Sequence, residues 1–165
     1  KSMQGVLKIG SKFSNYKELK RRYDRDVRMQ FHPAGTNADA IIIHEMGHQL
    51  DGYLTQRGVW GGNVSLYGTT SVAVKREVLQ QLGYFDYIRA ERAEWTRMGY
   101  KGRELNEALE FSKKEFITKH ISEYANKNER EFFAECFAEY LMSARPREAA
   151  KIFGEVLEKI MEGLR

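Results

Sequence analysis

Ile41-Ile42-Ile43-His44-Glu45-Met46-Gly47-His48 is an apolar run that leads directly into two histidines spaced four residues apart. On a helix, residues with this spacing lie on the same face, about one turn from each other. The imidazoles of His44 and His48 can therefore hold one Zn²⁺ ion. The three isoleucines favour burial of the beginning of this helix, which predicts an enclosed site for the histidines.

Glu45 completes the pattern H-E-x-x-H that zinc-dependent peptidases use. Its carboxylate can reach a zinc-bound water without being a ligand, take a proton from it and leave a hydroxide that attacks a polarised carbonyl. The alternative is an amphipathic helix whose polar face happens to carry two histidines. Gly47 argues against that alternative, because glycine in a helix interior costs about 1 kcal/mol relative to alanine and here indicates close approach by another backbone.

The length of 165 residues predicts a single domain over 1–165, large enough for a hydrophobic core. No apolar run approaches the roughly 20 residues that a membrane span needs, so we expect no membrane partner. The chain begins with Lys1 and not with methionine, and its start carries no visible secretory signal. These features predict a piece of a longer protein whose targeting information lies elsewhere.

Cysteine content and charge exclude several classes of function. Cys136 is the single cysteine, which excludes an intramolecular disulfide and a cysteine-rich metal site, and its apolar neighbours predict a buried thiol. The net charge is +4, from 27 basic and 23 acidic residues. The basic residues are mixed with acidic ones and no nucleic-acid motif accompanies them, so a nucleic-acid-binding domain is the weakest interpretation.

Periodicity predicts a helix-rich domain with a small mixed sheet, an α+β fold of two layers. Short strands are expected at 4–9 and 29–31, the latter at a sheet edge because a proline follows it. The histidine helix is expected to begin after Asn37 or Asp39 and to end at Gly52. The other helices are expected at 15–28, 71–82, 84–98, 103–119, 129–143 and 147–164, with a loop over 58–70 and a break over 121–128.

A catalytic zinc site needs a third protein ligand. The candidates in this chain are Asp51, Glu131, Glu135, His32 and His120. Asp51 follows His48 by three residues and would point away from a metal held by both histidines, so a role at the helix end or in orienting a ligand fits it better. His32 and His120 are better explained as structural histidines.

Glu131 and Glu135 share one face of the helix predicted over 129–143. Glu131 could bind zinc, while Glu135, one turn further on, could accept a proton from a ligand imidazole and so fix its tautomer. Alanines beside that face would allow this helix to approach Gly47 closely. Two alternatives stay open: Asn128 and Glu131 match a capping box, and Glu135 could be a solvated glutamate.

Two segments resemble the active-site segments of the anthrax lethal factor-type zinc peptidases. The first is 44–51 (H-E-M-G-H-Q-L-D) and the second is 124–135 (Y-A-N-K-N-E-R-E-F-F-A-E). In that family the glutamate that opens E-F-F-A-E is the third zinc ligand, and a tyrosine seven residues before it faces the metal-bound group. The resemblance therefore implies that Glu131 binds zinc and that Tyr124 faces it.

The wider chain, including 31–36 (F-H-P-A-G-T), is similar to the zincin-type domain at the ends of some phage minor head (head-morphogenesis) proteins. The region 52–121 departs from the toxin, so no substrate preference follows from the first resemblance. The two resemblances imply a zincin-like domain with its active site between two helices. They also imply phage capsid or parent-protein domains as partners, and a cytoplasmic or virion-associated location.

These features together predict a zinc-dependent endopeptidase of the gluzincin type that acts on a peptide or protein substrate. His44, His48 and Glu131 would bind Zn²⁺. Glu45 would be the general base, and Tyr124 would stabilise the oxyanion or protonate the leaving amine. A packing role would explain Tyr124 without the resemblance, since it is one of nine tyrosines.

Three further expectations concern the surroundings of the site. Glu135 would orient a ligand imidazole, and Asp51 is a weaker candidate for that role. A peptide would lie extended along the predicted edge strand near Phe31.

The rival interpretation is a zincin fold kept as a structural or interaction module of a phage head-morphogenesis protein, with weak or no proteolysis. The presence of Glu45 argues against that rival, because an inactive module has no need of a general base.

Overall fold

Helix α6 (Glu129–Met142) is the centre of the computed structural model, which describes residues 15–61 and 69–164. Asn128 caps its first turn, because its side chain accepts a hydrogen bond of 2.9 Å from the Glu131 N–H. Every residue from Phe132 to Glu139 is buried. A helix that is buried on all sides needs neighbours in every direction, so the other helices pack around it.

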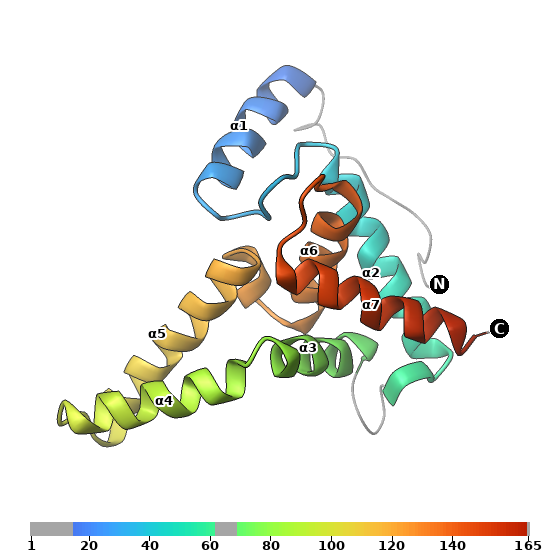
Figure 1. Ribbon diagram of the computed structural model, residues 1–165. Helices are drawn as coiled ribbons and strands as arrows, with labels where there is room; N and C mark the ends of the chain where they lie inside the picture. Colours follow the sequence, from blue (N-terminus) through green and yellow to red (C-terminus); the bar gives the residue numbers. More distant parts are fainter. Residues whose placement is uncertain (1–14, 62–68, 165) are drawn as a thin grey trace, which may run out of the picture.

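Three helices cover α6 directly. α2 (Ala40–Gln56) lies alongside it, and α3 (Thr70–Gln81) and α7 (Glu148–Glu162) pack against it from other sides (Figure 1). Phe133 of α6 and Phe153 of α7 meet edge to face with ring centroids 4.9 Å apart, a geometry that aromatic rings favour. All of these helices contribute to one apolar core, which includes Leu54, Val74, Val78, Phe132, Phe133, Phe137, Phe153 and Val156.

A smaller cluster anchors α1 (Tyr16–Arg28) to the rest of the chain. Tyr23 is buried in it against small side chains of neighbouring segments, Ala38, Ala40 and Ala138. The Tyr23 and Thr36 hydroxyls lie 3.2 Å apart, and the Tyr23 ring stacks on His32 with centroids 4.6 Å apart. These contacts hold the loop that follows α1 in place and fix the position of His32.

α4 (Tyr84–Arg97) and α5 (Gly102–His120) form a helical hairpin that projects from the rest of the molecule (Figure 1). Its turn contains Gly99 and Gly102 with φ of 96° and 52°, a region of backbone conformation that favours glycine. After α5 the chain forms the short 3₁₀-helix η3 (Tyr124–Asn126) and then enters α6. The hairpin therefore connects directly to the segment that carries Tyr124.

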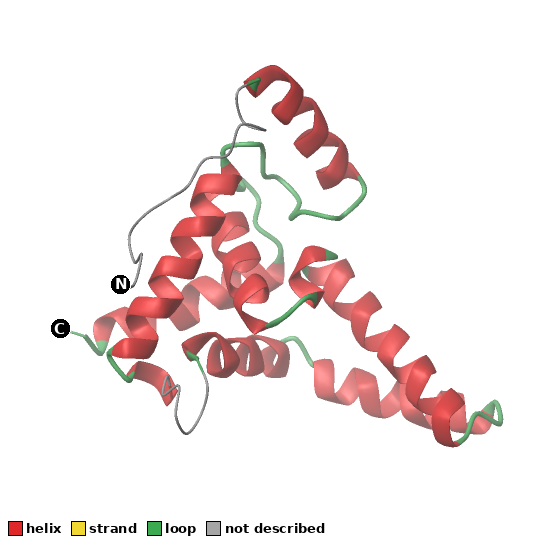
Figure 2. Cartoon of the chain, turned by 180° about the vertical axis from the view of Figure 1, so that it is seen from behind, coloured by secondary structure: helices red, strands yellow, loops and turns green. Residues whose placement is uncertain are grey.

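The predicted α+β fold with a mixed sheet is wrong, because residues 15–61 and 69–164 form helices and contain no strand (Figure 2). The strand predicted at 4–9 lies outside the described residues. The chain turns at 29–31, where Gln30 has a φ of 60°. The Gln30 carbonyl accepts a hydrogen bond from the Glu123 N–H (2.8 Å), and the Phe31 carbonyl accepts one from the Tyr124 N–H (3.1 Å). Three residues of alternating polarity were too short a signal to distinguish this anchored turn from a strand.

The predicted helix boundaries agree with the structure within two residues, except for α2. α2 continues through Gly52 to Gln56 because Leu54, on the following turn, is fully buried and extends the apolar side of the helix. Asp39 is its N-cap without a side-chain capping bond, and Asn37 accepts a hydrogen bond from the Asp39 N–H (2.8 Å). The short 3₁₀-helix η2 (Val59–Gly61) follows α2 within the predicted loop. None of the described helices is both long enough and apolar enough to cross a membrane.

Candidate metal centre

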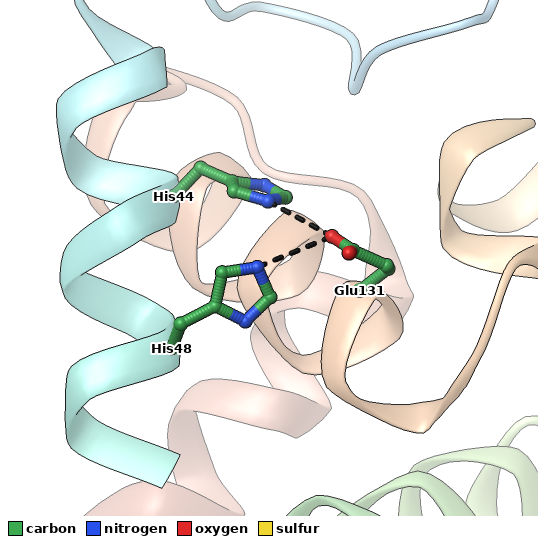
Figure 3. A group of neighbouring side chains, drawn as sticks. All are labelled: His44, His48 and Glu131. Carbon is green, nitrogen blue, oxygen red and sulfur yellow. Dashed lines mark hydrogen bonds and ion pairs between the residues drawn. The ribbon is translucent and has the colours of Figure 1, made fainter. Parts of the chain in front are cut away.

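His44 and His48 project from α2 toward Glu131 on α6 (Figure 3). Their Nε2 atoms lie 3.0 Å and 3.2 Å from the same Glu131 oxygen, Oε2. The three side chains are 12%, 15% and 19% exposed, so they are shielded but open to solvent on one side. One nitrogen or oxygen atom of each residue lies within 4.8 Å of the others. Three residues separated by as many as 87 positions in the chain therefore form one compact group.

The close approach of α2 and α6 depends on Gly47. A Cβ atom at this position would lie 3.0 Å from the Ala134 Cα and 3.2 Å from the Phe137 Cδ1. The first of these neighbours is backbone and cannot move aside as the end of a flexible side chain can. Glycine therefore allows the two helices to approach until Glu131 reaches both histidines.

The donor set fits a zinc ion. Two imidazole nitrogens and one carboxylate oxygen are the ligands of a familiar class of catalytic zinc site, in which a fourth position stays open. Tetrahedral geometry with bonds of about 2.0–2.1 Å places ligand atoms about 3.3 Å apart. The two nitrogen–oxygen separations of 3.0 Å and 3.2 Å are close to that spacing.

Glu135 holds His44 from the side opposite Glu131. Its carboxyl group is 2% exposed, and its Oε1 lies 2.8 Å from the His44 Nδ1. With the proton on Nδ1, His44 donates to Glu135 and turns the lone pair of Nε2 toward the metal position. The Ser122 hydroxyl donates to the other oxygen of Glu135 (2.8 Å), and the His32 Nδ1 lies 3.5 Å from that oxygen.

The electrostatics of the group favour an ionised Glu135 between two imidazoles. Burial opposes a charge on His44, but the hydrogen bond to Glu135 and the nearby carboxylates outweigh it and raise the His44 pKa above its usual value. Burial likewise opposes a charge on Glu135, but the contacts with His32 and His44 lower its pKa. Burial, followed by the neighbouring His44, lowers the pKa of His48 and favours the neutral imidazole that a metal requires.

A cavity of about 220 Å³ opens beside His44 and is bordered by Glu45, Tyr124, His32 and Phe31. The Tyr124 ring stands edge-on to the His44 ring, with centroids 5.7 Å apart. Neither Glu45 nor Tyr124 belongs to the group of atoms that converge on Glu131. Both instead border the cavity, which shares His44 with that group.

Asp51 lies away from the metal position. It is fully buried, and its carboxylate accepts hydrogen bonds from the Ser71 N–H (2.7 Å) and the Ser71 hydroxyl (3.1 Å). The His48 Nδ1 is buried and has no partner among the described residues, so Asp51 does not orient that imidazole. The structure thus places Asp51 against the first turn of α3 and not beside a zinc ligand. It does not lie at the end of its own helix, as the sequence predicted, because α2 continues to Gln56.

Of the two remaining candidate ligands, His32 lies at the site and His120 lies elsewhere. His32 reaches Glu135 and the cavity, whereas His120 stacks on Phe116 with ring centroids 4.3 Å apart and contacts none of the three converging residues. Ser122 was missed by the sequence analysis. No local signal marks it, since its partner Glu135 lies 13 residues away and the contact depends on how η3 packs against α6.

The predicted binding of a peptide to an edge strand near Phe31 is wrong. Strand addition requires an exposed edge with free N–H and C=O groups. The Gln30 and Phe31 carbonyls are instead occupied by the N–H groups of Glu123 and Tyr124. The Phe31 side chain nevertheless borders the cavity, so this loop contributes a wall to the site and not a strand.

No protein-family model, curated protein or solved structure matches this chain.

A pair of glycine substitutions on α2 tests the packing of the site. Gly47→Ala should lower the free energy of unfolding by about 1–3 kcal/mol, because its methyl group is forced against the α6 backbone. Gly52→Ala should instead raise it by about 0.4–1 kcal/mol, because nothing lies within 4 Å of the added methyl group and alanine favours the helix. Urea unfolding of both variants checks the difference. Equal effects of the two changes would contradict the proposed close approach.

A second substitution tests whether Asp51 stabilises the first turn of α3 or supports the metal site. Asp51→Ala removes the acceptor at the first turn of α3 and should cost about 0.5–2 kcal/mol of stability. Zinc affinity, measured with a competing chelator at a temperature where the variant is folded, should stay near that of the native chain. A marked loss of zinc affinity without loss of stability would return Asp51 to the metal site.

Proposed function

We propose that this chain is a zinc-dependent peptidase in which His44, His48 and Glu131 hold the metal. The observation that carries the proposal is the convergence of two imidazole nitrogens on one carboxylate oxygen, at separations close to those between zinc ligands. Glu45 directly follows His44 in the H-E-x-x-H pattern, the position expected of a general base, and it borders the adjoining cavity. The resemblance of the two segments to lethal factor-type peptidases supports the same assignment.

Each residue of the site has a chemical task in this proposal. Zinc, when bound, supplies a Lewis acid that lowers the pKa of a water molecule to about 7. The Glu45 carboxylate accepts a proton from the attacking water and passes it to the leaving amine. The Tyr124 hydroxyl donates a hydrogen bond to the carbonyl oxygen as negative charge develops on it. Glu135 keeps the proton of His44 on Nδ1, so that Nε2 faces the metal position.

The test combines metal content with hydrolysis. The purified chain should carry about one zinc per molecule, as the three-ligand set implies. His44→Ala and Glu131→Ala should each reduce zinc occupancy sharply. Removal of zinc with a chelator should abolish cleavage of an unbiased peptide library, and added zinc should restore it. Elemental analysis and mass spectrometry of the library provide the two measurements.

Different outcomes of this test have different meanings. Full zinc retention in Glu131→Ala would move the third ligand elsewhere, and Glu135 would be the first residue to examine. A chain that holds zinc at this centre but cleaves no peptide would overturn the enzymatic proposal in favour of a structural or interaction module. A chain that binds no zinc would overturn the proposal as a whole.

A further inference from the structure

Three hollows that share lining residues link the surroundings of His44 to α5. The cavity beside His44 shares Phe31 and Tyr124 with a hollow of about 800 Å³ between α5, η3 and the loop at 30–31. That hollow in turn shares Phe111 and Lys114 with an outer one of about 370 Å³ on the projecting part of α5. We call the two hollows on α5 together the α5 groove. It adjoins the cavity beside His44 at Phe31 and Tyr124.

Part of the groove follows one face of α5. Arg103, Glu107, Phe111, Lys114 and Thr118 are spaced by three or four positions, which is the spacing of a single helix face. Near the end of α5 the lining of the inner hollow widens around the helix to include Glu115, Phe116, Lys119 and His120. The lining part of α5 extends over 103–120, which corresponds to roughly 25 Å at 1.5 Å per residue. An extended peptide of about seven residues has a similar length. The groove therefore has the dimensions of a track for an extended chain.

Apolar rings distinguish the inner part of the groove. Phe31, Phe116, Tyr87 and Phe111 all contribute to its lining. Phe111 is 59% exposed, which is a large exposed fraction for a phenylalanine on an otherwise polar face of α5. A large apolar side chain of a bound peptide would remove this ring from water, and such aromatic contacts tend to dominate binding energy.

The charges along the groove exclude a track for nucleic acid. Its lining contains four cationic side chains, Lys114, Lys119, Lys127 and Arg103. It also contains four carboxylates, Glu107, Glu110, Glu115 and Glu123. A phosphate backbone requires a clear excess of positive charge. The balanced charges instead suit a polypeptide backbone and leave selectivity to the apolar rings.

We infer that the α5 groove binds the substrate as an extended polypeptide, and that its inner hollow selects a large apolar side chain several residues from the bond that is cleaved. This inference rests on the proposed peptidase function. Phe111 would determine the preference for a large apolar side chain. The hairpin of α4 and α5 carries the groove on one side of the metal centre. The longer part of the substrate would therefore lie on that side.

Two fluorescent peptides of 14 residues test the inference by direct binding. One contains phenylalanine at every third position in a glycine–serine background, so that some register places a ring in the inner hollow, and the other contains only glycine and serine. Anisotropy titration with zinc-loaded Glu45→Gln chain, which is expected not to cleave them, should show at least about tenfold tighter binding of the phenylalanine peptide. Equal affinity for the two peptides would overturn the inference.

A matched pair of variants locates the binding surface. Phe111→Ala should weaken binding of the phenylalanine peptide by about tenfold. Phe85→Ala removes a comparably exposed ring, 46% exposed and outside the groove, and should leave binding unchanged. Equal losses in both variants would contradict the inference. Self-association that disappears in Phe111→Ala would also contradict it, because a second copy of the chain would then occupy the groove.

Hydrolysis by the native chain separates this inference from the function on which it rests. Cleavage of the phenylalanine peptide with a raised KM in Phe111→Ala would support both. Binding that depends on Phe111 without any cleavage would overturn the peptidase proposal while the groove remained a peptide-binding surface. Cleavage that is indifferent to Phe111 would support the peptidase and overturn the role of the groove.

Discussion

Glu45→Gln should retain zinc and the native fold but lose most peptide hydrolysis, by about 10²–10⁴-fold. Glutamine has nearly the same shape and volume as glutamate, but its amide cannot accept the proton of an attacking water at neutral pH. The structure places Glu45 on the wall of the cavity beside His44 and outside the group that converges on Glu131. The substitution should therefore remove the base without removing a ligand.

The measurement needs kcat/KM, zinc content and a charge control. Glu155→Gln on α7 makes the same chemical change on an exposed residue and should leave all three quantities unchanged. A fall in hydrolysis together with loss of zinc would indicate that Glu45 supports the metal itself. Hydrolysis equal to that of the native chain would require a different base, and His32 on the same cavity would then be the nearest alternative to test.

The two helices of the site could be predicted because their signals are local. The spacing of His44 and His48 is a property of one helix, and Asn128 marks the beginning of another through its capping bond to the Glu131 N–H. Gly47 also carried information about tertiary structure, since a glycine within a helix indicated the close approach that the α6 backbone makes. These local features left several candidates for the third ligand, and only the resemblance of 124–135 to the second peptidase segment singled out Glu131.

The prediction of a sheet was wrong because the strand signals in the sequence were short. The segment 29–31 has too few residues to distinguish a strand from a turn, and its backbone is fixed by Glu123 and Tyr124, more than 90 positions away. Ser122 and the α5 groove were missed for a related reason. Their properties arise from the way η3 packs against α5 and α6, and no local pattern in the sequence encodes that packing.

The absence of strands among the described residues changes how substrate recognition has to be understood. A peptidase with an exposed sheet edge can bind the substrate backbone by adding it as a strand. In residues 15–61 and 69–164 no such edge exists, and the groups at Gln30 and Phe31 are already paired. Under the proposed peptidase function, we therefore expect the described residues to recognise a substrate through side chains in the α5 groove.

Arg147→Ala should be the most destabilising of the substitutions considered, with a loss of about 3 kcal/mol in the free energy of unfolding. The Arg147 guanidinium forms a two-pronged ion pair with Glu139, with nitrogen–oxygen distances of 2.9 Å and 2.7 Å. Glu139 is 1% exposed, so removal of its partner would leave an unpaired charge in the interior. Arg147 is 27% exposed, which places the cost at the lower end of the range for buried pairs.

The same arginine links this ion pair to the active-site segment. Its guanidinium also donates to the carbonyls of Lys119 and Ile121, directly before Ser122, which holds Glu135. Urea unfolding should show the large loss for Arg147→Ala and little change for Arg103→Ala, whose pair with Glu107 is exposed. Adding Glu139→Gln to Arg147→Ala should recover part of the loss, because the buried charge is then absent. A loss as small as that of Arg103→Ala would show that Glu139 finds another partner or water, and that the end of α5 does not depend on this ion pair.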